Sequence, residues 1–192
     1  MKWIVLAIIL IVVPYTFLTL RYRKAEPAFQ PYADLKNRAN VSRLLEAGYQ
    51  RISIAAHQPV DTARASGGAD VSTVDGGLPP ELRTTLVESP LLPVEISSVT
   101  AAPLANTLQP YSIHFTGTLP DDKQQLGGAD LFIRGDSLVI TPTFEHVSGD
   151  LRTRSRNAAV VLTIPAGVLK PGKYNVTLVG ERSSRSWSLE VK

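Results

Sequence analysis

Residues 171–191 read PGKYNVTLVGERSSRSWSLEV. Apolar residues alternate with polar ones twice in this stretch, so each series falls on one face of an extended chain. The two series are Tyr174, Val176, Leu178 and Trp187, Leu189, Val191. The stretch therefore predicts two strands, each with one buried face and one face in water.

The same alternation recurs upstream, in PYSIHFTG at 110–117 and in NAAVVLTIP at 157–165. Taken together, the short apolar runs and their turn residues predict strands at 94–100, 110–118, 129–134, 137–144, 158–164, 173–180 and 185–191. Seven short strands within about a hundred residues are typical of an antiparallel β-sandwich. The residues expected in its core include Tyr111, Phe115, Leu162, Tyr174, Val176, Trp187 and Leu189.

A Pro171–Gly172 turn directly precedes Tyr174, where a tyrosine corner would return its hydroxyl to upstream backbone. With its PGKYNVTL and WSLEV strands, the segment 94–192 resembles immunoglobulin-like or fibronectin-type-III-like domains of bacterial envelope proteins. The resemblance implies a sandwich outside the cytoplasm. It implies no binding residues, because the chain lacks the cysteine pair of antibody domains and has its only tryptophan of this region in the last strand.

An uncharged, mostly apolar stretch runs from Trp3 to Leu20. As a helix it would be about 27 Å long, close to the thickness of a bilayer's hydrocarbon core. Aromatic and basic residues flank it where they favour headgroups, and a membrane span tolerates its one proline. The sequence thus predicts a retained membrane anchor with Trp3, Pro14, Leu20, Arg21, Arg23 and Lys24 as its characteristic residues.

A cleaved leader and a buried soluble helix are the alternatives to an anchor. A leader needs small residues at the cut, whereas TLRYRKAEP at 19–27 supplies bulky and basic ones. The expected partner of the anchor is a lipid bilayer, with anionic headgroups meeting Arg21, Arg23 and Lys24. More Lys and Arg residues follow the apolar stretch than precede it, which favours a cytoplasmic location for the rest of the chain. The resemblance to envelope domains favours a location outside the cytoplasm for the segment 94–192, and this is the location we expect.

Between the anchor and the sandwich, apolar spacing predicts an amphipathic helix at about 33–47 and a short strand at QRISIAA, residues 50–56. The following stretch, 58–79, is small, polar and glycine-rich and predicts a flexible linker, after which Pro80 starts a short helix. The expected organisation is an anchor at 1–24, a juxtamembrane helix and strand at 25–57, a linker with a short helix at 58–93 and the sandwich at 94–192.

Composition limits the function further. The chain has no cysteine, which excludes disulfides, thiolate metal sites and cysteine nucleophiles. The net charge of +3 is uneven, with an excess of five positive charges in residues 1–52 and of two negative charges in the rest. Because the positive excess lies beside the apolar stretch, anionic lipid is the nearer partner, and we expect no nucleic-acid binding.

No motif for catalysis, a cofactor or a metal is expected. The three histidines, His57, His114 and His146, have no partner at metal-ligand spacing. Asp121 and Asp122 with Asp130 could form a calcium loop, but a polar turn is the simpler interpretation. DLRTRSRN at 150–157, with Arg152, Arg154 and Arg156, is interpreted as a solvated loop, and Asn40 and Asn175 fit the short glycosylation sequon.

These features predict a single-pass, membrane-anchored structural or interaction protein without enzymatic activity, which presents its β-rich module to a protein or glycan partner. The alternative is a carbohydrate- or peptide-binding accessory module of an envelope enzyme or secretion machine. That alternative predicts exposed aromatic rings, for which Phe132 and Phe144 are the candidates.

Overall fold

The computed structural model describes residues 2–3, 12–17, 31–58, 68–147 and 155–192, without the side chains of 31–34 and His146. The chain divides into two units, Met1–Asn37 and Arg38–Lys192, and each is described by itself. In the first unit, residues 12–17 are helical, with Pro14 among them, and the Thr16 hydroxyl donates to the Val12 carbonyl at 2.8 Å. Trp3 is exposed.

The described helices include none with both the length and the apolar character needed to cross a membrane. Most of the stretch expected to form the anchor, including Leu20, Arg21, Arg23 and Lys24, lies outside the described residues.

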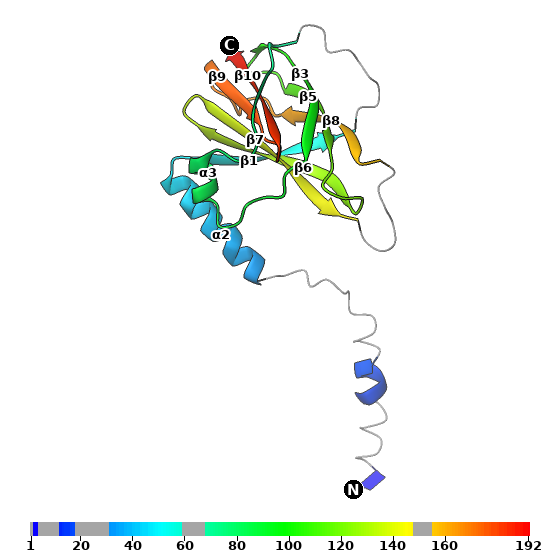
Figure 1. Cartoon of the computed structure of the whole chain (residues 1–192). Helices are drawn as coiled ribbons and strands as arrows, with labels where there is room; N and C mark the ends of the chain where they lie inside the picture. The colour runs from blue at the N-terminus through cyan, green and yellow to red at the C-terminus, as the bar shows by residue number, and fades with distance from the viewer. Residues whose placement is uncertain (1, 4–11, 18–30, 59–67, 148–154) are drawn as a thin grey trace. The chain divides into compact units, whose positions relative to one another are not determined.

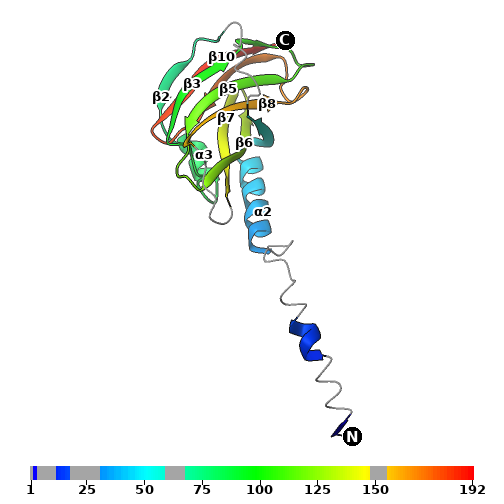
Figure 2. The same ribbon diagram turned by 90° about the vertical axis from the view of Figure 1, so that its right-hand side faces the viewer.

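The second unit is built around one strongly curled sheet, to which ten strands contribute within the described residues (Figures 1 and 2). The strands are β1 (Gln50–His57), β2 (Ser72–Asp75), β3 (Glu95–Ala101), β4 (Leu104–Ala105), β5 (Tyr111–Thr118), β6 (Gln124–Arg134), β7 (Ser137–His146), β8 (Asn157–Ile164), β9 (Gly172–Leu178) and β10 (Ser183–Val191). Their order is β2-β10-β9-β7-β6-β1-β8-β5-β3, and β4 pairs in parallel with the end of β10.

The fold is mainly β, as the sequence predicts, but the expected seven-stranded sandwich is replaced by this single curled sheet. Three strands outside the expected seven join it. β1 inserts between β6 and β8, β2 forms in the stretch expected to be a linker, and β4 lies beside β10. Sequence alternation shows which residues are extended, whereas these pairings depend on contacts between distant segments.

The two ends of the curled sheet meet. The Glu181 amide donates to the Pro93 carbonyl at 2.8 Å, and the Arg185 guanidinium donates from Nε to the Ile96 carbonyl at 3.0 Å. The curl encloses the main core, which contains apolar residues from almost every strand. Of the seven residues expected in the core, six are buried and Tyr174 is half-buried; the six are Tyr111, Phe115, Leu162, Val176, Trp187 and Leu189.

A second core lies on the outer face of the sheet. Helices α2 (Pro31–Glu46) and α3 (Pro80–Thr85) contribute Leu44 and Leu82, which are buried with residues of β6, β7 and the segment after β9. The outward residues of the strands in this core are Phe132 and Val139. Because β6 and β7 are covered on both faces here, they are apolar at consecutive positions. Phe132 is therefore not the exposed aromatic that the accessory-module alternative requires, and Phe144 is half-buried.

Tyr111 and Trp187 form a hydrogen-bonded pair inside the main core. The Trp187 indole Nε1 donates to the Tyr111 hydroxyl at 3.2 Å, and that hydroxyl donates to the Ala102 carbonyl at 2.7 Å. Burial raises the pKa of Tyr111 to about 12, while the hydrogen bond from Trp187 acts in the opposite direction. A neutral phenol is thus stabilised in the folded state.

The substitution Tyr111→Phe tests this arrangement through alkaline stability. A folded pKa above the unfolded value of 10 means that the stabilisation is complete below pH 10 and is lost as pH rises through about 12. The wild type should lose up to about 3 kcal/mol from this group over that range. The phenylalanine variant should be about 1–3 kcal/mol less stable at neutral pH, because an indole N–H and a carbonyl lose their partner. Its free energy of unfolding should decrease less steeply above pH 10 than that of the wild type. Denaturant unfolding at several pH values measures both effects, and parallel curves would contradict the assignment.

The turn before β9 has the hydrogen bond expected of a tyrosine corner. The Tyr174 hydroxyl donates to the Lys170 carbonyl at 3.0 Å, and Gly172 takes a positive φ of 156° between them. The ring also packs against the main core. The hydroxyl therefore connects the end of one loop to the strand that follows it.

Tyr174→Phe removes that hydrogen bond and keeps the ring. We expect a loss of about 1 kcal/mol in the free energy of unfolding, with an unchanged denaturant m-value. A variant as stable as the wild type would show that the corner contributes no net stability.

Candidate functional site

The site begins where β1 ends inside the sheet. β1 is antiparallel to β6 along Gln50–Ala55 and antiparallel to β8 along Ala55–His57. Beyond His57, the described residues place no strand between β6 and β8. Within the described part of the chain, the neighbouring segments of the two strands pair with β7 and β5 respectively.

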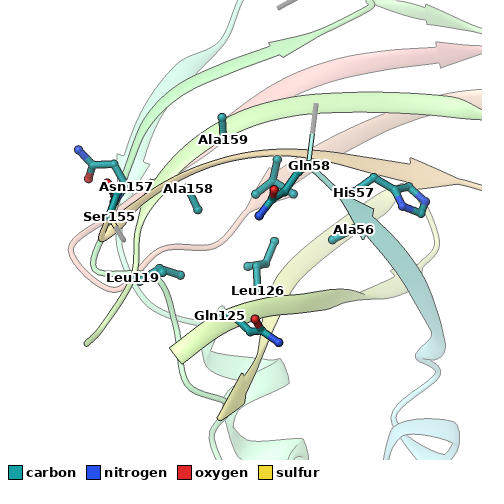
Figure 3. A pocket seen from close by; sticks show the side chains of 11 residues that line it. Ala56, His57, Gln58, Leu119, Gln125, Leu126, Ser155, Asn157, Ala158 and Ala159 are labelled. Carbon is teal, nitrogen blue, oxygen red and sulfur yellow. Dashed lines mark hydrogen bonds between the residues drawn. The ribbon is translucent and has the colours of Figure 1, made fainter. Parts of the chain in front are cut away.

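A cavity of about 550 Å³ occupies this position (Figure 3). Residues from the end of β1, the start of β6, the start of β8 and two adjoining loops line it. They are Ala56, His57, Gln58, Leu119, Gln125, Leu126, Ser155, Asn157, Ala158, Ala159 and Val160. Figure 3 shows Leu126 and Ala158 pointing toward each other from opposite strands.

The cavity combines an aliphatic interior with an amide-rich rim. Leu119 and Val160 are buried, and Leu126 and Ala158 are half-buried. Side chains of Gln58, Gln125 and Asn157 bring amide groups to the rim, whereas none of the lining residues is Asp, Glu, Lys or Arg. A site of this composition suits an uncharged ligand bound by apolar contact and hydrogen bonds.

Local features hold the two walls in place. On one wall, β6 has an irregular register between Leu126 and Gly128, at the point where its pairing with β1 ends. A side chain on Gly128 would bring its Cβ within 3.0 Å of the Ile54 carbonyl oxygen, so glycine allows the close approach of β1. On the other wall, the Arg156 guanidinium donates to the Pro120 carbonyl at 2.7 Å and positions the loop that carries Leu119.

Two of the carboxylates considered for calcium, those of Asp121 and Asp130, have structural partners. Asp121 Oδ1 accepts from the Lys123 amide at 2.7 Å, as expected of a polar turn. Asp130 is buried and accepts from Arg51 at 2.7 Å and from the Ser53 hydroxyl at 2.9 Å. Among the described residues, no group of three or more His, Cys, Asp or Glu side chains is placed to hold a metal ion.

The other candidates from the sequence are dispersed. His57 lies at the cavity, His114 is half-buried on β5, and His146 ends β7. Asn40 accepts from the Val87 amide and Asn175 accepts from the Ser186 hydroxyl. Arg152 and Arg154 lie outside the described residues.

Sequence reasoning missed the cavity because its residues are ordinary strand residues such as Gln125 and Ala158. Two local signals were present: the Gly127–Gly128 pair inside β6, and Pro59, two positions after the end of β1. A glycine within a strand often marks a bulge, and a proline cannot donate to a strand ladder. Neither signal identifies which strands come together.

No protein family model matches the sequence, and searches of curated proteins and of solved structures also give no match. The class that the fold itself defines is a mainly β protein with one curled sheet, two helices on its outer face and a strand-bordered cavity. Function must therefore be argued from the site.

Asp130→Ala tests the ion pair between β1 and β6. The substitution leaves Arg51 and Ser53, on the neighbouring strand, without their acceptor, so we expect a loss of about 2–3 kcal/mol in unfolding free energy. Asp75→Ala, at an exposed position of β2, serves as the control and should change stability by about 0.5 kcal/mol or less. Equal effects of the two variants would show that the ion pair contributes no net stability.

Proposed function

We propose that this chain is a membrane-anchored binding protein without enzymatic activity, which presents its β-rich unit to a partner at a membrane surface. The observation that carries the binding role is the cavity between β6 and β8. Its lining offers apolar contact, amide groups, the His57 imidazole and the Ser155 hydroxyl, and it contains no Asp, Glu, Lys or Arg.

The anchor part of the proposal is supported by sequence. Trp3–Leu20 contains no charged residue, and three basic residues follow within the next four positions. Such a stretch favours insertion, and the basic residues favour anionic headgroups. We place the β-rich unit outside the cytoplasm because of its resemblance to envelope domains, although the count of basic residues favours the opposite side.

A more specific form of the proposal is an accessory module that binds peptide or carbohydrate for an envelope enzyme or secretion machine. The peptide form has the better support. A sugar platform uses exposed aromatic rings, whereas Phe132 is buried under the helices and the cavity lining contains no Phe, Tyr or Trp. The strand edges and amide groups at the cavity suit a ligand that offers main-chain N–H and C=O groups instead.

Fractionation of cells that express the full chain with a C-terminal tag tests the anchor. The wild type should sediment with membranes and resist extraction by alkaline carbonate. Leu10→Arg places a charge in the middle of the apolar stretch, which costs about 3 kcal/mol in membrane insertion, and should shift protein to the soluble fraction. Leu91→Arg, at an exposed position of the β-rich unit, is the matched control and should stay with the membranes. Carbonate-soluble wild type would overturn the anchor.

Reporter fusions after Lys192 test the side of the membrane. Alkaline phosphatase is active only outside the cytoplasm, so an active phosphatase fusion together with a dark fluorescent-protein fusion is expected. A fluorescent fusion with inactive phosphatase would place the β-rich unit in the cytoplasm and would show that the basic residues after Leu20 determine the orientation.

A further inference from the structure

We infer that a groove on the outer face of β9 and β10 binds a neutral saccharide through the sugar hydroxyl groups. This outer groove has a volume of about 660 Å³ and shares no lining residue with the cavity between β6 and β8. The inference rests on the proposed binding role and names a second site with its class of ligand. It depends neither on the anchor nor on the cavity.

The outer groove crosses four neighbouring strands. In the sheet, β4, β10, β9 and β7 follow one another, and β9 and β10 lie side by side near the C-terminus (Figure 1). Asp136, in the turn between β6 and β7, lines one end of the groove, and Pro103 and Leu104 line the other. Three strand spacings separate these ends, which is about 14 Å.

The register of β9 and β10 brings four polar side chains together in the groove. Asn175 lies opposite Ser188, and Lys173 lies opposite Glu190. Side chains opposite each other on antiparallel strands share a face, with Cβ atoms about 5 Å apart. Val176, the residue after Asn175, is buried in the main core, so these four side chains point away from that core.

The polar groups of the groove do not satisfy one another. Within the described chain, Lys173 and Glu190 form no ion pair, and their charged ends have no hydrogen-bond partner. Among the same residues the Asp136 carboxylate has no partner either, although its main-chain carbonyl accepts from the Asn175 amide at 2.8 Å. Asn175 Oδ1 accepts from the Ser186 hydroxyl at 3.0 Å, which orients the side-chain amide.

This set of groups suits hydroxyl groups of a ligand. A sugar hydroxyl both donates and accepts hydrogen bonds. The carboxylates of Asp136 and Glu190 accept from hydroxyls in charge-assisted bonds, while the Lys173 ammonium donates to them. An anion would meet two carboxylates in the groove, and a cation would meet the lysine. The mixed charges therefore favour a neutral ligand rich in hydroxyls.

The groove also offers apolar contact at one end. The Leu104 side chain is 51% exposed, and Pro103 beside it is exposed as well. Tyr174, which is half-buried, lines the same groove. A pyranose ring has hydroxyls around its rim and C–H groups on its faces, so it needs both polar and apolar neighbours. The outer groove supplies both, whereas the cavity between β6 and β8 has no aromatic lining.

The main chain of β9 is already paired beneath the groove. Asn175 pairs with Ser188 of β10 on one side and with Ser137 of β7 on the other. A peptide that adds as a strand needs unpaired main-chain groups at an edge. Side chains are what this face presents, which is why we assign it to a saccharide.

Titration of the full chain with defined neutral trisaccharides tests the inference. The probes are maltotriose, cellotriose, mannotriose and chitotriose. The chain is kept in a detergent without a sugar headgroup, because a maltoside would compete for the site. Saturation-transfer NMR should show at least one probe binding with a dissociation constant on the order of 1 mM or below. No saturation by any of the four up to about 20 mM would overturn the inference.

Paired substitutions locate the site. Asp136→Asn together with Glu190→Gln keeps the side-chain sizes and removes both carboxylates, so it should weaken binding by about tenfold or more. Asp75→Asn together with Glu181→Gln is the matched control, since it removes two negative charges at exposed positions that do not line the groove. The control should bind as the wild type does. Equal binding by both double variants would overturn the location.

A dye beside the groove gives a second measurement that does not depend on these variants. Because the chain has no cysteine, Ser137→Cys provides one attachment point, exposed and next to Asp136. The emission of an environment-sensitive dye there should change saturably with the bound trisaccharide. Dye on Ser112→Cys, exposed on β5, should not respond. A response at both positions or at neither would contradict the site.

The outcomes separate this inference from the proposed function. Membrane retention without saccharide binding would leave the anchored binding protein standing and remove the role of the outer groove. Saccharide binding by a carbonate-soluble chain would overturn the anchor and leave the groove. Self-association in sedimentation experiments that Asp136→Asn with Glu190→Gln abolishes, without binding of any saccharide, would overturn the inference in favour of a second copy of this chain.

Discussion

Strand β1 connects the two halves of the sheet. On one side of it lie β2, β10, β9, β7 and β6, and on the other lie β8, β5 and β3. Ala55 alone pairs with both halves, and Ile54 next to it is buried in the common core. Without β1 the two halves would expose long unpaired edges. The main core and the closure of the curl therefore depend on eight residues that directly follow α2 and its short turn.

The outer core adds a second constraint. Phe132 and Val139 point away from the curl and need their own cover, which Leu44 of α2 and Leu82 of α3 provide. Arg134 reinforces this cover, since its guanidinium forms an ion pair with Glu81 and lies 5.2 Å from the centre of the Tyr49 ring. The two helices are thus part of the β-rich unit's packing, and the sheet is covered on both faces at β6 and β7.

Sequence patterning located the strands well because alternation has a local cause. Tyr111, Ile113 and Phe115 are buried as their period of two predicts. The arrangement of the strands in one sheet or two layers was harder to predict, because a curled sheet and a sandwich need the same inward-facing residues. β2 escaped prediction because all four of its residues are exposed, and its register with Ser183–Ser186 is fixed by main-chain pairing. The cavity escaped it because its lining comes from strand ends and loops that are far apart in the sequence.

The position of β1 has a consequence for how the protein forms. Ala55 is synthesised 108 residues before its partner Thr163. At translation rates of about 5–20 residues per second, β1 waits roughly 5–20 s for the strand that completes its pairing. Its edges are open to other strands during that interval, including those of nearby nascent chains. The same insertion between distant strands gives the fold many long-range contacts, which slow its folding relative to a helical protein of equal length.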